Sequence, residues 1–245
     1  MSILISSIKN SYKKLSLSFT KESWLASFFF FLVLCSWYIL RPVRNEMAVQ
    51  NSDILPYLLG AGAFVMLLLN PIYSWLASRR NLKGVLVGCY SFFIVNLFTF
   101  IVLWEFFDLS SAVWLSQIFY IWCNVYSFFV VSIFWVVIIN LFRGDGATNV
   151  FGVIAAGGSL GAFLGSEISK QLASTFNESG IIFFTFISIF FLMLALVVGL
   201  LLLKRFVSRE GIDNAAGGSS FDALKTLFHP LKLDLSDCIC ISGLQ

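Results

Sequence analysis

The chain has 245 residues, of which 59% are hydrophobic and 12% charged, and its formal net charge is +3. Soluble domains contain about 25% charged residues, so the composition excludes an ordinary soluble domain and predicts a membrane protein. A net charge this small, scattered among apolar runs, also argues against nucleic-acid binding. The lone His229 and five cysteines lack the spacing of a zinc site, so we expect no metal and no cofactor.

Six apolar runs are long enough to cross the bilayer, because ~30 Å of hydrocarbon needs about 20 helical residues. Turn and charge signals separate them. We therefore expect an all-α fold with six transmembrane helices over 24–40, 54–76, 84–104, 112–142, 150–172 and 181–203. The domain organisation that follows is an arm over 1–23, a bundle over 24–203 and a C-terminal segment over 204–245.

The Lys and Arg residues predict the orientation of these helices. If the N-terminus is cytoplasmic, 13 of the 16 cations fall on the cytoplasmic side, in the arm, in two loops and after residue 203. Cytoplasmic loops carry such an excess of cations, so both termini are expected inside. The exceptions are Arg41, Arg44 and Lys170.

Two of these exceptions lie at the end of the first run. On a helical wheel Tyr38, Arg41 and Asn45 share one side, with Arg44 close to them. Pro42 cannot donate a hydrogen bond to the carbonyl of Tyr38, so the helix should bend or open there. An opened helix at membrane depth is tolerated where it lines a water-filled cavity.

These arginines have three interpretations. Their forked guanidinium groups suit a phosphate or carboxylate ligand, which makes Arg41, Arg44, Tyr38 and Asn45 candidate substrate-binding residues. They can instead anchor the helix end to lipid headgroups. Glu46 can also pair with one of them inside the protein.

The fourth run carries a polar stripe at helical spacing. A face with amide side chains should meet protein or a cavity rather than lipid. Hydrogen bonding between helices and cavity lining both explain it, and Gln117 and Asn124 are the further candidate substrate-binding residues. The stripe consists of Gln117, Tyr120, Asn124, Ser127, Val131 and Trp135.

The fifth run contains Gly157, Gly161 and Gly165 in a double GxxxG pattern. Small residues at this spacing let two helix backbones approach closely, so we expect another helix to pack there. A phosphate-binding loop is excluded because no Lys-Ser/Thr pair follows a glycine and no strand precedes it. No nucleophile–base pair occurs either, and the spans have almost no Asp or Glu, so an enzyme is not expected.

Three segments carry a resemblance to a known family. The loop "PIYSWLASRRNLKG" over 71–84 resembles the loop 2–3 motif of major facilitator superfamily transporters, with Ser78 where the motif has aspartate. The segments "YILRPVRNEM" over 38–47 and "VFGVIAAGGSLGAFLG" over 150–165 are similar to the first and fifth helices of bacterial and plastid nucleotide (ATP/ADP) translocase relatives. Asn45 replaces the aspartate more usual in that family.

The resemblance implies transport of a small anionic metabolite, with nucleotide exchange as one form, by alternating access in a bacterial inner membrane. Such transporters contain two six-helix halves, and this chain matches the N-terminal half. Either the product is truncated, or a second half-transporter or a second copy completes it. A structural or regulatory six-helix membrane protein without transport is the alternative from another class.

Overall fold

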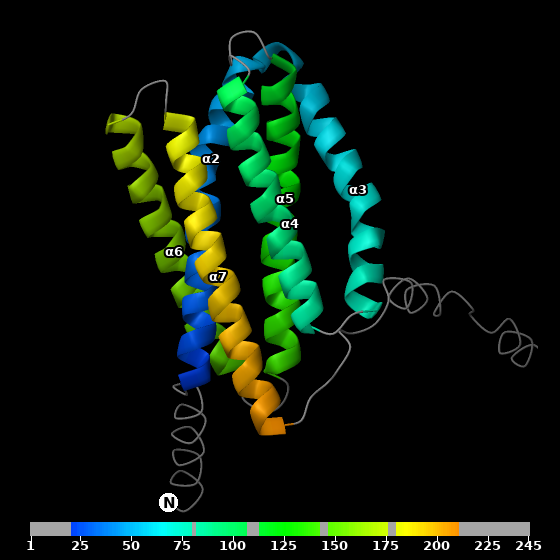
Figure 1. The fold of residues 1–245 in the computed structure, drawn as a ribbon, viewed down its shortest axis with the longest axis vertical. Coiled ribbons are helices and arrows are strands. Elements are labelled where there is room, and N and C mark those ends of the chain that lie inside the picture. The colour runs from blue at the N-terminus through cyan, green and yellow to red at the C-terminus, as the bar shows by residue number, and fades with distance from the viewer. Residues whose placement is uncertain (1–20, 80–81, 107–112, 143–146, 176–179, 211–245) are drawn as a thin grey trace, which may run out of the picture.

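The computed structural model describes residues 21–79, 82–106, 113–142, 147–175 and 180–210. Within these ranges the chain is helical, and six helices are long and apolar enough to cross a membrane, as predicted. The start of α2 and the end of α7 lie at the same end of the bundle (Figure 1). The elements are α2 (Lys21–Gln50), the 3-10 helix η1 (Ser52–Ile54), α3 (Leu55–Arg79), α4 (Leu82–Phe106), α5 (Val113–Leu141), α6 (Ala147–Thr175) and α7 (Gly180–Glu210).

Several expected features lie outside the described residues. They are most of the N-terminal arm, parts of the charged loops, and the C-terminal segment from residue 211 onward, with His229, Cys238 and Cys240.

The first helix, α2, is the centre of the bundle. It packs against α6, α7 and α5, and its contact with α6 is the most extensive between any two helices. In its most apolar stretch 61% of the residues are buried, against 11% for α3. Large side chains such as Phe29, Leu32 and Ile39 are fully enclosed. The position of α2 therefore determines how the other helices are arranged.

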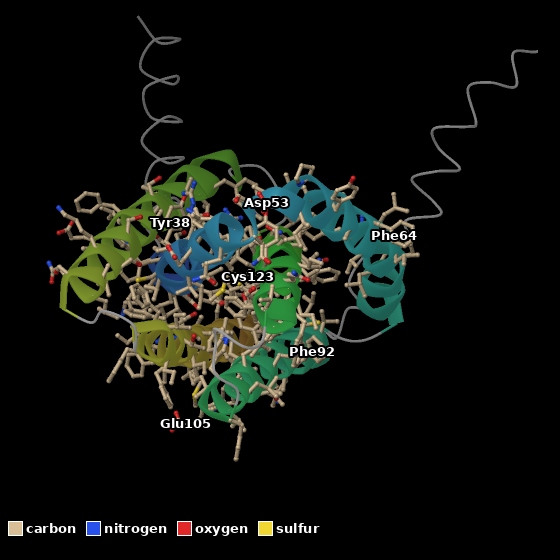
Figure 2. All side chains as sticks on the ribbon, turned by 90° about the horizontal axis from the view of Figure 1, so that it is seen from above. Tyr38, Asp53, Phe64, Phe92, Glu105 and Cys123 are labelled. Atoms are coloured by element: carbon tan, nitrogen blue, oxygen red, sulfur yellow. The ribbon has the colours of Figure 1, made fainter. Side chains whose placement is uncertain are left out.

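The second helix, α3, lies at the edge of the bundle (Figure 1). Its main partners are α5 and η1, with little contact to α4. Phe64 is 62% exposed and lies on the outside of the bundle, as does Phe92 of α4, whereas Cys123 lies in the interior (Figure 2). Exposed phenylalanines of this kind suit a lipid-facing surface.

Three buried hydroxyl groups join α2, α5 and α7. Ser36 Oγ lies 2.7 Å from the Tyr126 hydroxyl and donates to the Ser188 carbonyl at 2.9 Å. Ser188 Oγ in turn donates to the Ser36 carbonyl at 3.0 Å. Such bonds between membrane helices contribute about 0.6 kcal/mol each on average, so they set the register of the helices more than they stabilise the fold.

The end of the first helix differs from the prediction. Helix α2 continues past Leu40 to Gln50 and does not open at Pro42, so of the two expected outcomes, a bend or an opening, the opening is wrong. The apolar run ends before the helix because Arg41, Arg44 and Glu46 lower the hydropathy of the segment. Charged residues do not prevent a helix from continuing. Asn51 follows directly, and its Nδ2 donates to the Met47 carbonyl at 2.9 Å, which satisfies one of the last carbonyls of the helix.

Candidate functional site

Arg44 is held between α2 and α5 by uncharged groups. Its Nη1 donates to Asn124 Oδ1 at 3.2 Å and its Nη2 to Asn45 Oδ1 at 2.9 Å. Its Cζ lies 5.5 Å from the centre of the Trp37 ring, within the range of a cation–π interaction. The side chain is half-buried. The structure thus brings together three of the predicted site residues, Arg44, Asn45 and Asn124.

No carboxylate neutralises this guanidinium among the residues that the structure describes. Glu46, the expected internal partner, instead accepts a long hydrogen bond of 3.4 Å from Gln50 Nε2. The Nε of Arg44 is buried and has no acceptor in the described part of the chain. The partly buried guanidinium therefore has no opposite charge beside it in the described residues and has one unused donor, which is costly away from water.

Arg41 is placed differently. It is exposed, and its Cζ lies 5.3 Å from the centre of the Tyr38 ring. Tyr38 lies where α2 passes α6 (Figure 2): a Cβ built on Gly165 would be 3.0 Å from the Tyr38 Cβ. The predicted pair therefore diverges, with Arg44 directed to α5 and Arg41 exposed over the Tyr38 ring.

The guanidinium groups of both arginines are directed toward the middle of α2. Trp37 precedes Arg44 by seven positions and Tyr38 precedes Arg41 by three, or about 10 and 5 Å along a helix that rises 1.5 Å per residue. This direction follows from the helix, in which side chains point toward the N-terminus. The guanidinium groups consequently lie nearer the middle of α2 along its axis than their own backbone atoms.

Gln117 belongs to a second polar group, centred on Asn51. The amide of Asn51 is buried, its Nδ2 donates to Ser116 Oγ at 2.8 Å, and its Oδ1 accepts from Gln117 Nε2 at 3.1 Å. These bonds tie the end of α2 to the start of α5. Gln117 thus makes a helix–helix hydrogen bond and does not contact Arg44.

Asn124 lies where three helices approach one another. Besides accepting from Arg44, it donates from Nδ2 to the Tyr120 carbonyl of its own helix at 3.2 Å. A Cβ built on Gly62 of α3 would be 3.7 Å from that Nδ2, so α3 passes close by. The central part of the polar stripe therefore faces α2 and α3.

The three glycines of α6 face the backbone of α2. A Cβ on Gly157 would meet Ser27, one on Gly161 would meet Phe31, and one on Gly165 would meet Cys35. On both helices these contacts recur every four residues, because residues four apart share one face. The close approach also lets Ser27 Oγ donate to the Val153 carbonyl of α6 at 2.9 Å.

Sequence reasoning did not single out three residues that matter here. Trp37 was detectable, because seven positions place it on the same helical face as Arg44. Ser169, whose Oγ lies 3.2 Å from the Tyr38 carbonyl oxygen, continues the glycine spacing by four, but the sequence does not indicate which carbonyl it reaches. Asn51 looked like an ordinary turn residue, and its contacts with α5 depend on the tertiary fold.

Within the described ranges no cluster of three or more His, Cys, Asp or Glu side chains could hold a metal ion. Comparison of the chain with protein-family models, curated proteins and solved structures found no match. The interpretation of the Arg44 site therefore depends on its geometry and on the resemblance of the segments described above.

Proposed function

We propose that the protein transports a small anionic metabolite across a bacterial inner membrane and that Arg44 binds the anion. In this proposal the six helices form one half of a major facilitator-type transporter, with both termini in the cytoplasm. A second half-transporter or a second copy of the chain supplies the other half, and the two alternate access to the site. Nucleotides of the ATP/ADP type are the first substrates to test.

The observation that supports this proposal most directly is the half-buried Arg44 without a carboxylate partner. Removing a cation from water is costly unless an opposite charge compensates it. A bound anion would provide that charge, and a forked guanidinium offers phosphate or carboxylate paired hydrogen bonds. Asn124 and Asn45 hold the group in place without neutralising it.

The direction of the side chains argues against headgroup anchoring. An arginine that anchors a helix end extends its charge toward the membrane surface. Arg44 instead lies over Trp37, further from the end of α2 at Gln50. Arg41 is exposed, so its proposed role is to attract the anion toward Arg44.

One observation favours the alternative, a six-helix protein with a structural or regulatory role and no transport. Gln117 and Asn51 use their amides to join α2 to α5, so part of the polar stripe already has a packing role. In that case Arg44 would be a packing residue of the same kind, and its removal would destabilise the bundle without affecting any ligand.

Equilibrium binding of anions to the purified chain in lipid nanodiscs distinguishes the anion-binding role of Arg44 from a purely structural role. Labelled ATP, ADP and inorganic phosphate would be titrated against the parent protein, Arg44→Lys and Arg41→Lys. Lysine keeps the charge but lacks the fork, and a hydrogen bond to a charged group contributes ~1.5–3 kcal/mol, so Arg44→Lys should weaken binding by about 10- to 150-fold. Arg41→Lys should bind almost normally, because attraction at a distance needs only charge.

Arg205→Lys is the matched control, because Arg205 is exposed and lies near the C-terminal end of α7. It should bind like the parent. Equal affinity of the parent and Arg44→Lys would contradict binding of the anion by the forked guanidinium group of Arg44. Failure of the parent to bind any of the three anions would show that this half alone does not form a phosphate-binding site.

A further inference from the structure

Pro42 leaves one backbone carbonyl of α2 without its usual donor. In a regular helix the N–H of residue 42 would donate to the carbonyl of Tyr38, and proline has no N–H. Ser169 of α6 occupies that position: its Oγ lies 3.2 Å from the Tyr38 carbonyl oxygen. Ser169 is 3% exposed. A buried hydroxyl from another helix thus replaces the missing backbone donor.

The glycine spacing of α6 makes this contact possible. Ser169 follows Gly157, Gly161 and Gly165 at the same interval of four residues, so it lies on the face that packs against α2. At Gly165 the backbones are so close that a Cβ would be 2.8 Å from the Cys35 carbonyl oxygen. Only with the helices this close can a side chain as short as serine reach a main-chain carbonyl.

The Ser169 hydroxyl has one proton and three nearby acceptors. Besides Tyr38, its Oγ lies 2.9 Å from the Gly165 carbonyl and 3.4 Å from that of Ile39. In a regular helix those two carbonyls already accept a backbone N–H from four residues later. The Tyr38 carbonyl does not, because residue 42 is proline. The proton therefore stabilises the structure most when it is donated to Tyr38.

We propose that Ser169 is a positioning residue that fixes the segment of α2 beyond Pro42, and with it Arg41 and Arg44. Neighbouring serines can satisfy the carbonyls that proline frees in membrane helices. Here the satisfied carbonyl lies at the base of the segment that carries both arginines. The consequence for ligand binding rests on the proposed function of Arg44, whereas the coupling between Ser169 and Pro42 does not.

A double-mutant cycle tests the coupling without any ligand. In Ser169→Ala the Tyr38 carbonyl loses its donor, and Tm in detergent should fall by about 5 °C. Pro42→Ala supplies the backbone N–H instead, so in that background Ser169→Ala should change Tm by much less. The control is Ser166→Ala, since Ser166 is exposed on the same helix and its Oγ donates to the Ala162 carbonyl of that helix. It should leave Tm unchanged.

Amide hydrogen exchange shows whether the effect is local. Ser169→Ala should accelerate exchange over residues 43–50 by about tenfold, with little change in α4. The double variant with Pro42→Ala should return exchange to the level of Pro42→Ala alone. A purely structural role would instead accelerate exchange throughout the bundle.

The proposal fails if Ser169→Ala lowers Tm equally in both backgrounds, because the serine would then act without Pro42. It also fails if Ser169→Ala behaves like Ser166→Ala. If Ser169→Ala alone does not fold, the double variant should fold, and its failure to do so would equally contradict the coupling.

Phosphate binding, measured on the same variants, tests whether the position of Ser169 affects ligand binding by Arg44. Where the parent binds, Ser169→Ala should weaken affinity and Pro42→Ala should restore it. Coupling in Tm and exchange without phosphate binding by the parent would support the positioning role and contradict a phosphate site at Arg44 in this half alone. Normal phosphate affinity in Ser169→Ala would refute the link between the serine and Arg44.

Discussion

Gly161 lies at the closest approach of α6 to the central helix, so Gly161→Ala should destabilise the bundle. A Cβ at this position would be 2.8 Å from both the carbonyl carbon and the Cα of Phe31, and nearer still to the carbonyl oxygen. These are backbone atoms of α2 and cannot rotate away. Carbon atoms in contact are normally ~3.5–4.0 Å apart, so α6 would have to withdraw by roughly 1 Å.

The magnitude follows from two opposing terms. A radial gap of about 0.5–1 Å forfeits roughly a quarter to a half of the dispersion energy of each affected contact, and overpacking costs about 1–3 kcal/mol. Alanine recovers up to about 1 kcal/mol of helix propensity over glycine. A Cβ on Gly152 of the same helix would meet nothing within 4 Å. Gly152→Ala therefore keeps the propensity gain without the clash.

Thermal unfolding of both variants in one detergent measures the difference. Gly161→Ala should unfold roughly 5 °C below Gly152→Ala. Gly158→Ala should fall between them, because its Cβ would meet the side chains of Phe30 and Leu34, which can move. Equal Tm values for Gly161→Ala and Gly152→Ala would refute the packing of this α6 face on α2.

Two further predictions concern the end of α2 and the orientation. Asn51→Ala removes the amide that accepts from Gln117 and leaves buried partners unsatisfied, so it should lower the free energy of unfolding by about 1–3 kcal/mol in a thermal unfolding assay. The control is Asn96→Ala, which should cost little because the Asn96 amide bonds its own helix. An equal loss of stability in both variants would contradict the role of Asn51 in joining α2 to α5. Reporter fusions at residues 110 and 208 should report outside and inside, because 13 of the 16 cations lie on one side; the opposite pattern would overturn the proposed orientation.

The sequence predicts the number of helices well because the bilayer sets their length. Each predicted apolar run overlaps one observed helix, and most ends differ by a few residues. Two ends differ more, because the first run ends at Leu40 and its helix at Gln50, and the last run ends at Leu203 and its helix at Glu210. Hydropathy reports the transfer of side chains into lipid. Near Pro42 the Tyr38 carbonyl has a hydrogen-bond donor from α6, the Ser169 hydroxyl at 3.2 Å, and the residues around Pro42 do not indicate that contact.

The site is predictable only as far as one helix determines it. Arg44 and Asn45 are neighbours in the sequence, and Trp37 shares the face of Arg44 by helical spacing. The pairing of Arg44 with Asn124, and of Gln117 with Asn51, depends on how α5 is placed along α2. Periodicity identifies the polar face of α5, but the register between two helices is a property of their packing.

The partners of Arg44 offset part of the cost of placing a guanidinium group between α2 and α5. An arginine at the centre of a membrane helix costs about 2.5–3.5 kcal/mol on insertion scales. A cation–π contact with Trp37 contributes roughly 0.5–2 kcal/mol, and hydrogen bonds to Asn124 and Asn45 offset more of that cost. A carboxylate would stabilise the charge further, but it would compete with any anionic ligand. Uncharged partners orient the guanidinium and leave its charge unpaired in the described part of the chain, as the proposed anion-binding role requires.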